Sequence, residues 1–234
     1  MNTLVSVVSP IYNDRQSLPD VLPELVKELK RAFSAWEIIL IDDVSSDGSR
    51  EWARNYCKNK SNIKLFFHAK NEGIAKTYRE LYGKAKGDVI VLFSLDGEWD
   101  PVDAVGLAKA LMTRNEDIVV GIRRQKQYTI WRSIVSALYN TFTSDLFGVD
   151  TRDAGSIKAF KRDMVARIPI ISRGVFDEAE RLIRARKSGY TIGFLDVSHK
   201  KATKIKRGIR SAHVWEAALD MMRVFWDIHF GQSI

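Results

Sequence analysis

The stretch of residues 89–101 constrains the fold of this chain more than any other part of its sequence. It opens with five apolar residues, Val-Ile-Val-Leu-Phe, and such a β-branched run between turn signals is typical of a strand buried on both faces. Its character then changes, because Asp96, Glu98 and Asp100 follow closely and Pro101 prevents further strand pairing. Ligands of open α/β sheets bind beyond the carboxyl ends of strands, where carboxylates can hold a divalent cation and, through it, phosphate. A solvated acidic turn that caps the next helix is an equal alternative.

Three more apolar runs are predicted strands, at residues 4–9, 37–41 and 63–67. We expect Pro10 to end the first of them. Helical patterns separate the strands, at residues 17–33, 50–57 and 74–86, and Ser17 is a candidate cap for the first. Strands and helices that alternate with short connections predict an α/β fold with a mostly parallel central sheet flanked by helices.

The charge of the chain indicates an anionic partner. The formal net charge is +8 and the pI about 9.5, which suits nucleic acid, anionic lipid or a phosphorylated substrate. Cys57 is the only cysteine, which excludes an intrachain disulfide and a cysteine zinc site and favours a reducing, intracellular compartment. The N-terminus lacks the basic lead of a signal peptide, and no run reaches the roughly 18 apolar residues of a membrane span. We therefore expect a cytoplasmic protein, soluble or peripheral at the inner face of the membrane.

Two acidic clusters follow strands of the predicted sheet. Asp42 and Asp43 come directly after the second strand, and Asp96 and Glu98 follow the fourth. No glycine-rich dinucleotide fingerprint or P-loop follows any of these strands. Two such clusters at strand ends would be an unusual coincidence for solvated turns, so the sequence favours a ligand site there.

Short motifs continue along most of the chain. They are Ser-Pro-Ile-Tyr-Asn-Asp at 9–14, Asp-Asp at 42–43 with Ser-Asp-Gly-Ser at 46–49, Asn-Glu-Gly at 71–73, Ala-Lys-Gly-Asp at 85–88, Asp96 with Asp100 and Pro101, Gly-Ile-Arg at 121–123, the spacing of Arg132, Ser136 and Asn140, Asp-Ala-Gly-Ser at 153–156, and Glu180 with residues 184–193. Their order and spacing resemble the family 2 glycosyltransferases with a GT-A nucleotide-sugar fold. The resemblance is greatest to the branch that transfers hexoses, such as mannose, to polyprenol phosphate or dolichol phosphate.

The sequence departs from this family at the metal motif. The motif is usually Asp-x-Asp with a glutamine two residues on, whereas here Ser94 replaces the first aspartate and Glu98 replaces the glutamine. Only Asp96 keeps its place. Asp14 likewise stands where the family usually has a glutamate.

The resemblance implies a site for a nucleotide-sugar donor, GDP-mannose or a UDP-hexose. The residues that it implies for the nucleoside pocket are Pro10, Tyr12, Asp14, Asp42 and Asp43. One of the paired aspartates would accept hydrogen bonds from the base or ribose, and a helix cap is the alternative for Asp43. Asp96, helped by Glu98, would hold Mg²⁺ or Mn²⁺ against the diphosphate.

A phosphate acceptor is already an anionic nucleophile, so it needs cations for positioning rather than a general base. The candidate acceptor-phosphate ligands are Arg123, Arg132, Lys158, Arg207 and Arg210, in a basic neighbourhood that includes Arg124, Lys126, Lys200, Lys201, Lys204 and Lys206. A solvated basic loop is the alternative for each of them. Glu180 is the candidate base for a hydroxyl acceptor, or it pairs with Arg184 on the same helix. The candidate catalytic residues are therefore Asp96, Arg123, Arg132 and Glu180.

The C-terminal region is a candidate amphipathic helix. We divide the chain into a GT-A domain, residues 1–211, and a helix region, residues 212–234. The apolar residues of this helix are Val214, Ala218, Met221, Met222, Phe225 and Ile228, with Trp215, Trp226 and Phe230 widening the stripe. Because it follows the basic cluster, it can lie on an anionic membrane, and packing on the domain, on a second subunit or on an integral-membrane partner is the alternative. The histidines, His68, His199, His213 and His229, lack metal-site spacing and are interpreted as ordinary.

The sequence thus predicts an inverting transferase that moves a hexose to polyprenyl (dolichyl or undecaprenyl) phosphate at the cytoplasmic membrane face, in cell-envelope glycan biosynthesis. One alternative is transfer to a hydroxyl of a glycan or lipid-linked saccharide. Another, suggested by Ser94, is a catalytically weak nucleotide-binding or scaffold protein. A specific nucleic-acid binder would explain the charge but not the acidic clusters.

Overall fold

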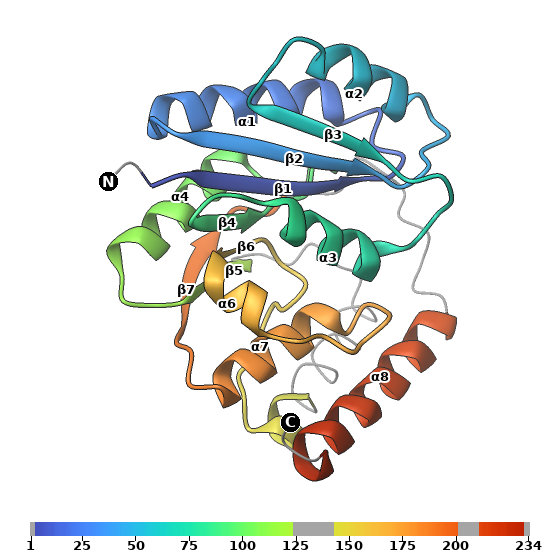
Figure 1. Ribbon diagram of the computed structural model, residues 1–234, viewed down its shortest axis with the longest axis vertical. Helices are drawn as coiled ribbons and strands as arrows, with labels where there is room; N and C mark the ends of the chain where they lie inside the picture. The colour runs from blue at the N-terminus through green and yellow to red at the C-terminus, as the bar shows by residue number, and fades with distance from the viewer. Residues whose placement is uncertain (1–2, 124–142, 201–210, 232–234) are drawn as a thin grey trace.

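The computed structural model describes residues 3–123, 143–200 and 211–231, and within them the strands form one seven-stranded sheet (Figure 1). The strands are β1 (Val5–Ile11), β2 (Trp36–Asp42), β3 (Ile63–Phe67), β4 (Val89–Leu92), β5 (Ile118–Arg123), β6 (Lys158–Lys161) and β7 (Ile192–Val197). Their order in the sheet is β3-β2-β1-β4-β6-β5-β7. Only β6 among them is antiparallel to its neighbours, so the predicted α/β fold with a mostly parallel sheet is confirmed.

Helices cover both faces of this sheet (Figure 1). They are α1 (Leu18–Ala32), α2 (Ser49–Cys57), α3 (Ile74–Lys84), α4 (Pro101–Thr113), α6 (Arg162–Arg167), α7 (Asp177–Lys187) and α8 (Ser211–Phe230). One core packs α1 and α4 on the first face, and a second core packs α3, α7 and α8 on the other. Successive residues of β2 alternate between the two cores, Ile38 and Leu40 in one and Ile39 and Ile41 in the other. This double burial explains why the strands read as continuous apolar runs.

The first strand does not end at Pro10 as expected, because β1 runs on to Ile11. The carbonyl oxygen of Val8 accepts from Phe93, next to β4, whereas that of Ile11 accepts from Asp43, next to β2. Alternate residues of a strand face opposite neighbours, so the side of Pro10 that lacks an N–H faces β4. Pairing with β4 has already ended at Val8, and the missing donor therefore breaks no ladder hydrogen bond.

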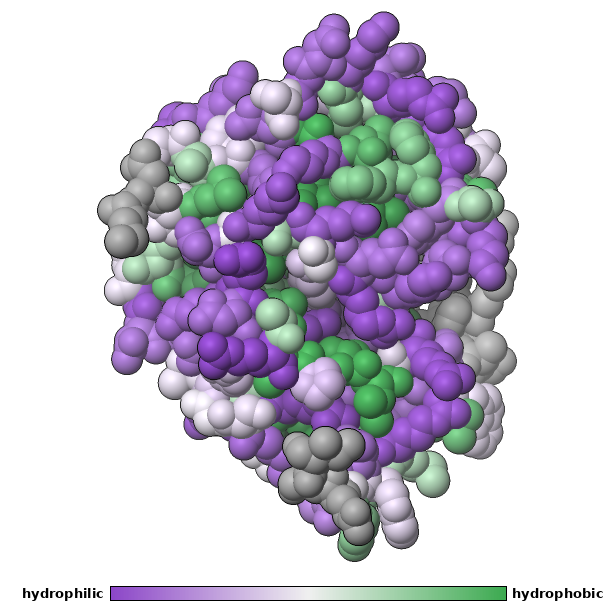
Figure 2. Space-filling view, viewed as in Figure 1, coloured by the Kyte–Doolittle hydropathy of each residue, from purple (hydrophilic) through white to green (hydrophobic). Residues whose placement is uncertain are grey.

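Helix α8 belongs to the second core. Met221 and Val224 are buried in that core, and Asp227 pairs with Arg184 of α7 at 2.7 Å. The predicted apolar stripe is therefore split, because its inner residues contact the domain while others face outward. Figure 2 shows a largely hydrophilic face on which apolar residues also reach the surface. No helix within the described residues is both long enough and apolar enough to cross a membrane.

A buried polar cluster joins β1, β2 and the start of β4. The carboxylate of Glu37 accepts hydrogen bonds from the Ser6 hydroxyl at 2.7 Å and from the Lys86 backbone at 2.8 Å. The Gly87 backbone donates to the same Ser6 hydroxyl at 2.8 Å. A Cβ at Gly87 would lie only 2.6 Å from the Leu4 carbonyl oxygen and 2.7 Å from the Ser6 backbone nitrogen. Glycine is therefore required here by close packing.

We expect Gly87→Ala to lower the free energy of unfolding by about 1–3 kcal/mol, because the new methyl group forces two strands apart. Gly83→Ala is the matched control, since a Cβ there meets nothing within 4 Å and alanine favours the helix by about 0.5 kcal/mol. Urea denaturation followed by circular dichroism measures both. Equal stability of the two variants would contradict the packing argument.

Candidate functional site

Loops from three parallel strands meet at one edge of the sheet. They follow β1 at residues 12–14, β2 at residues 43–48 and β4 at residues 93–100. The Ser46 backbone donates to the Asn13 side chain at 2.7 Å, and the Asn13 backbone donates to the Ser45 hydroxyl at 2.9 Å. The Ser17 hydroxyl donates to the Leu95 carbonyl at 2.7 Å and so connects the first loop to the third. The acidic clusters predicted from the sequence therefore share one rigid edge.

The first loop presents the predicted nucleoside-pocket residues. Pro10 is in β1, and Tyr12 projects into solvent with 53% of its surface exposed. Asp14 is buried, and its carboxylate accepts from the Tyr12 backbone at 3.0 Å. Asn13 has a left-handed backbone with φ 56°, which turns the chain sharply between them. Asp14 thus holds the loop in shape, while Tyr12 is exposed at its surface.

Asp42 is fully buried at the end of β2. Its Oδ1 accepts from Arg50 Nε at 2.6 Å and from the Ser45 backbone at 3.3 Å. Its Oδ2 is buried and has no hydrogen-bond partner among the described residues. A buried carboxylate oxygen without a donor is costly, so Asp42 retains acceptor capacity for a ligand or a water.

Asp43 clamps a neighbouring loop instead of capping helix α2. Its Oδ1 accepts from the Glu72 backbone at 2.8 Å, and its Oδ2 accepts from the Gly73 backbone at 3.0 Å. His68 Nδ1 lies 2.7 Å from Oδ1 as well, and its Nε2 lies 3.3 Å from Glu80. From the sequence, Asp43 was expected either to contact a ligand or to cap a helix. Neither expectation included this binding of a neighbouring loop.

His68 is therefore not an ordinary histidine. Burial disfavours its charged form, but the hydrogen bonds and charges of Asp43 and Glu80 outweigh burial and raise its pKa. It comes directly after β3, which pairs with β2, and its place at the end of a predicted strand was the signal that the sequence offered.

The acidic loop after β4 is joined to the segment that follows β7. Asp96 is half-buried and accepts from the Glu98 backbone at 3.1 Å. Glu98 is buried beside His199, with 3.6 Å between Oε2 and Nε2, and its carbonyl accepts from the Lys200 backbone at 2.8 Å. Asp100 caps α4 through Val102, as the helix-cap alternative predicted for this turn. His199 was missed because nothing in the sequence places residue 199 beside residue 98.

The same loop is the candidate metal centre. Among the described residues, no group of three or more His, Cys, Asp and Glu side chains forms a complete site. Magnesium commonly takes one or two protein carboxylates and completes its shell with waters and substrate phosphates. Asp96 and Glu98 are the two carboxylates of this loop that would hold a cation bound together with a diphosphate, and Ser94, half-buried nearby, contributes no carboxylate.

Arg123 ends β5 with its guanidinium held in place. Its Nη2 lies 2.8 Å from Asp153 Oδ1, and its backbone donates to Asp153 Oδ2 at 3.0 Å. The guanidinium carbon is 5.8 Å from the ring centre of Trp99, in the acidic loop. The structure thus brings this predicted phosphate ligand next to the candidate metal centre.

Lys158 requires a correction. It was predicted to contact the acceptor phosphate, but its side chain is fully buried in the second core. Its Nζ donates to Glu178 Oε2 at 2.8 Å and to the Ala154 carbonyl at 2.6 Å. A lysine whose charge is neutralised in the interior cannot reach a ligand, so its role is structural.

Glu180 also requires a correction. It was the candidate base for a hydroxyl acceptor, but it is fully buried. Its carboxylate accepts from the backbones of Ile171 and Ser172 and from Arg184 Nε at 2.6 Å. The pairing with Arg184, one helical turn on, was the alternative, and the structure contains it.

A buried acidic pair at the start of α7 was absent from the predictions. Asp177 and Glu178 are both buried. Burial and then the charge of Glu178 raise the pKa of Asp177 to about 7, whereas Lys158 and Arg181 outweigh burial and lower the pKa of Glu178. Burial, and then the charges of Glu178, Asp177 and Asp96, raise the pKa of Tyr78.

Several predicted site residues lie outside the described part of the chain. They are Arg124, Lys126, Arg132, Ser136, Asn140, Lys201, Lys204, Lys206, Arg207 and Arg210. Their proposed contacts with an acceptor phosphate remain predictions.

Comparison with known proteins identifies related sequences. Residues 6–168 match the profile of the family described as glycosyl transferase family 2. The undecaprenyl-phosphate 4-deoxy-4-formamido-L-arabinose transferase of Aeromonas hydrophila is 31% identical over 164 residues, covering 69% of this chain and 50% of that protein. The protein of the same name from Pseudomonas savastanoi is 29% identical over 163 residues, covering 69% and 48%. The chain spans about half the length of these relatives.

Solved structures share the fold at low sequence identity. Mannosyl-3-phosphoglycerate synthase from Rubrobacter xylanophilus has a TM-score of 0.78 and 16% identity, over 99% of this chain and 77% of that one. Glucosyl-3-phosphoglycerate synthase from Mycobacterium tuberculosis, crystallised with Mn²⁺, uridine diphosphate and phosphoglyceric acid, has a TM-score of 0.74 and 16% identity, over 96% and 78%. Both support the GT-A nucleotide-sugar fold.

The raised pKa of His68 leads to a pH prediction. The pKa of His68 is higher in the folded state than in the unfolded state, where it is about 6.5. The ion pair with Asp43 therefore stabilises the protein fully below about pH 6.5. This stabilisation is lost as the pH rises through the folded pKa. We expect His68→Gln to cost most stability below about pH 6.5 and progressively less above it. Urea denaturation over a pH series measures this, with His229→Gln on α8 as the control. The same pH dependence in both variants would refute the role of the ion pair.

Proposed function

Because this chain belongs to the family 2 glycosyltransferases, we propose that it transfers a sugar from a nucleoside diphosphate sugar to a polyprenyl phosphate. The similarity to undecaprenyl-phosphate transferases over 164 residues carries the choice of acceptor. A hexose donor is the expectation from the sequence, whereas these relatives are named for an arabinose derivative, so the sugar is to be identified by assay. The proposed acceptor is a lipid, so the proposed reaction takes place at a membrane, and the cytoplasmic face is the expectation from the sequence.

In the proposed reaction an acceptor phosphate oxygen attacks C1 of the donor sugar. A new C1–O bond forms to the lipid phosphate as the C1–O bond to the diphosphate breaks. The electron pair of that bond leaves with the nucleoside diphosphate, and the configuration at C1 inverts. No proton has to be removed from the nucleophile, so the task of the protein is to position two anions against each other.

The first two loops suit the nucleoside half of the donor. Tyr12 offers an exposed ring for stacking on a base, and Asp42 has an acceptor oxygen without a donor. Asp14 and Asp43 act indirectly, because their carboxylates are already bound to the backbone of the loops that they shape. We assign them to positioning and Tyr12, Pro10 and Asp42 to contact.

The loop after β4 suits the diphosphate. Asp96 and Glu98 would hold a divalent cation there, and when bound this cation neutralises the charge that develops on the leaving nucleoside diphosphate. Glucosyl-3-phosphoglycerate synthase, which shares the fold, was crystallised with uridine diphosphate and Mn²⁺ or Mg²⁺. This supports a divalent cation beside the diphosphate in this fold. Arg123, oriented by Asp153, is the described cation best placed to hold a second anion next to this loop.

A hydroxyl acceptor is the second candidate, and Asp177 is the observation in its favour. This buried carboxyl has a pKa of about 7, and one of its oxygens has no hydrogen-bond partner among the described residues. A base that removes a proton from a hydroxyl works best with a pKa near the working pH. Asp177 is buried as Glu180 is, but both oxygens of Glu180 are held by backbone N–H groups and Arg184, whereas one oxygen of Asp177 has no partner among the described residues. Asp177 is therefore the residue to substitute in order to distinguish the two acceptor classes.

We expect Asp96→Asn to abolish cation-dependent binding of nucleoside diphosphate and to lower transfer by at least about a hundredfold, because a hard cation loses its carboxylate ligand. Calorimetry with uridine and guanosine diphosphates, with and without Mn²⁺, measures the binding. Glu98→Gln is expected to be milder, and Asp163→Asn, an exposed carboxylate on α6, is the control. If Asp96→Asn retained full Mn²⁺-assisted binding, the metal assignment would be wrong.

We expect Asp177→Asn to retain substantial transfer to a short-chain prenyl phosphate, with an unchanged pH profile, because a phosphate nucleophile needs no base. Arg123→Gln is expected to raise the KM for the acceptor strongly while donor binding is retained. Product formation from a panel of UDP-sugars and GDP-mannose, detected by mass spectrometry, measures both. Transfer by the wild type to a saccharide hydroxyl instead of the prenyl phosphate, lost in Asp177→Asn with intact donor binding, would favour the hydroxyl acceptor.

A further inference from the structure

Helix α8 carries a continuous apolar stripe on its outer face. The stripe, here called the α8 stripe, consists of Trp215, Leu219, Met222, Trp226 and Phe230. These residues are spaced by three or four positions, so they align along one side of the helix. Each has between 50% and 72% of its surface exposed. A face of five large apolar side chains in water is unusual for a monomer and marks an interaction surface.

The opposite face of α8 is anchored to the domain, so the stripe is not a misplaced core face. Met221 and Val224 are buried in the second core. The Asp220 carboxylate, fully buried, accepts from the backbones of Arg173 and Gly174 at 2.9 Å each. With the inner face occupied, the helix cannot bury its outer stripe by rotation.

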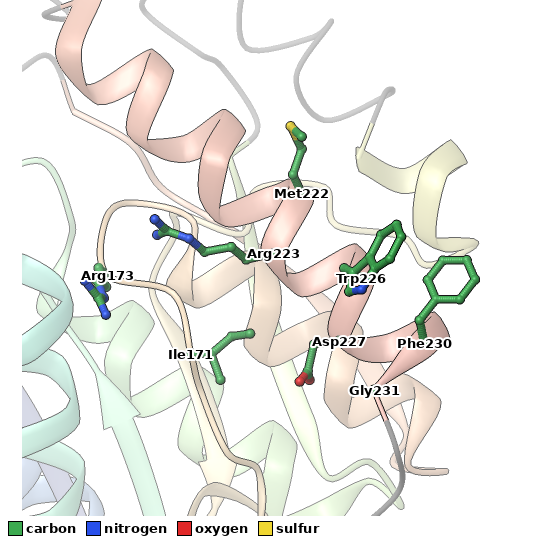
Figure 3. Close-up of a pocket in the computed structure, with 8 residues that line it drawn as sticks. All are labelled: Ile171, Arg173, Met222, Arg223, Trp226, Asp227, Phe230 and Gly231. Carbon is green, nitrogen blue, oxygen red and sulfur yellow. The ribbon is translucent and has the colours of Figure 1, made fainter.

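A groove adjoins the stripe, and its charged lining residues are two arginines, Arg173 and Arg223, and one aspartate, Asp227, which is paired with Arg184. It has a volume of about 730 Å³ and lies between α8 and the loop that precedes α7 (Figure 3). Its walls include Met222, Trp226 and Phe230 from the stripe, with Ile171 from the loop. Arg173 and Arg223 lie on one side of it, and Trp226 and Phe230 on the other (Figure 3). The surface therefore combines exposed aromatic rings with guanidinium groups.

We propose that the α8 stripe and this groove dock the protein on an anionic lipid surface. Indole rings favour the boundary between headgroups and acyl chains, and a helix with one apolar side can lie in that plane. Arginines beside the inserted face meet lipid phosphates. This inference rests on the proposed function, because a protein that uses polyprenyl phosphate must reach that lipid in a bilayer.

The charge beside the stripe favours lipid over a second copy of the chain. The stripe extends from residue 215 to residue 230, so its midpoint lies beside Arg223. A two-fold dimer that packed two stripes antiparallel would place the Arg223 side chains of both copies opposite each other. Asp220 pairs with Arg223 at 3.1 Å, but 53% of the Arg223 side chain is exposed, so two such side chains at the centre of an interface oppose association, whereas lipid phosphates complement them.

The test is binding of the whole protein to vesicles of phosphatidylcholine alone and mixed with phosphatidylglycerol, by co-sedimentation. Leu219→Glu and Trp226→Glu place charge in the stripe at exposed positions, and Met112→Glu on α4 is a matched control at another exposed apolar residue. We expect each stripe variant to weaken binding to anionic vesicles by about tenfold or more and Met112→Glu to have no effect. Arg173→Gln should weaken binding to anionic vesicles only, and added salt should weaken binding of the wild type.

Thermal melting by circular dichroism checks that each variant is folded, and light scattering gives its oligomeric state. Undiminished vesicle binding by both stripe variants would overturn the inference. A dimeric wild type that the stripe variants convert to monomers, without change in vesicle binding, would assign the stripe to a second copy instead. Transfer to a water-soluble short-chain prenyl phosphate without vesicles tests the proposed function separately, because stripe variants should retain it. Vesicle binding without any such transfer would support the docking surface and contradict the proposal that polyprenyl phosphate is the acceptor.

Discussion

Burial of the central sheet on both faces is the constraint on which the rest of this structure depends. All seven residues of β2 and all four of β4 are buried. Charged side chains that bind a ligand are therefore placed where the strands end. Because the strands are parallel, those ends coincide at one edge, and Asp43 and Asp96 are brought into one site. Charged residues inside the layer have partners: Glu37 of β2 accepts from Ser6 and pairs with Lys64, and Lys158 of β6 is neutralised by Glu178.

Much of the charge at this edge organises the protein rather than a ligand. Asp43 binds two backbone N–H groups and His68, and Asp14 binds the backbone of its own loop. Such bonds hold loops in place before a ligand arrives, which lowers the entropy cost of binding. The residues left for contact are fewer than the motifs suggest. Tyr12 is exposed, and the Arg123 guanidinium lies 5.8 Å from the Trp99 ring in the loop that carries Asp96, which is the arrangement on which the proposed phosphate contacts rest.

Helix α8 shows how one amphipathic pattern can serve two surfaces. Its sequence is apolar on more of its circumference than a single packing face requires. The domain uses the side that carries Met221 and Val224, and the side that carries Trp215 and Trp226 remains exposed. The helix is therefore at once a part of the core and a candidate for contact with a membrane.

The sequence by itself determined the α/β class, the first four strands and the acidic ends of β2 and β4, because apolar runs and turn residues are local signals. It could not determine which carboxylates remain available, since the partners of Asp43 and Glu180 are distant in sequence or depend on how loops fold back. Nor could it place His199 beside Glu98 or find Asp177, whose pKa depends on burial. Tertiary structure decided these points, because burial and hydrogen-bond partners are properties of packed neighbours and not of spacing along the chain.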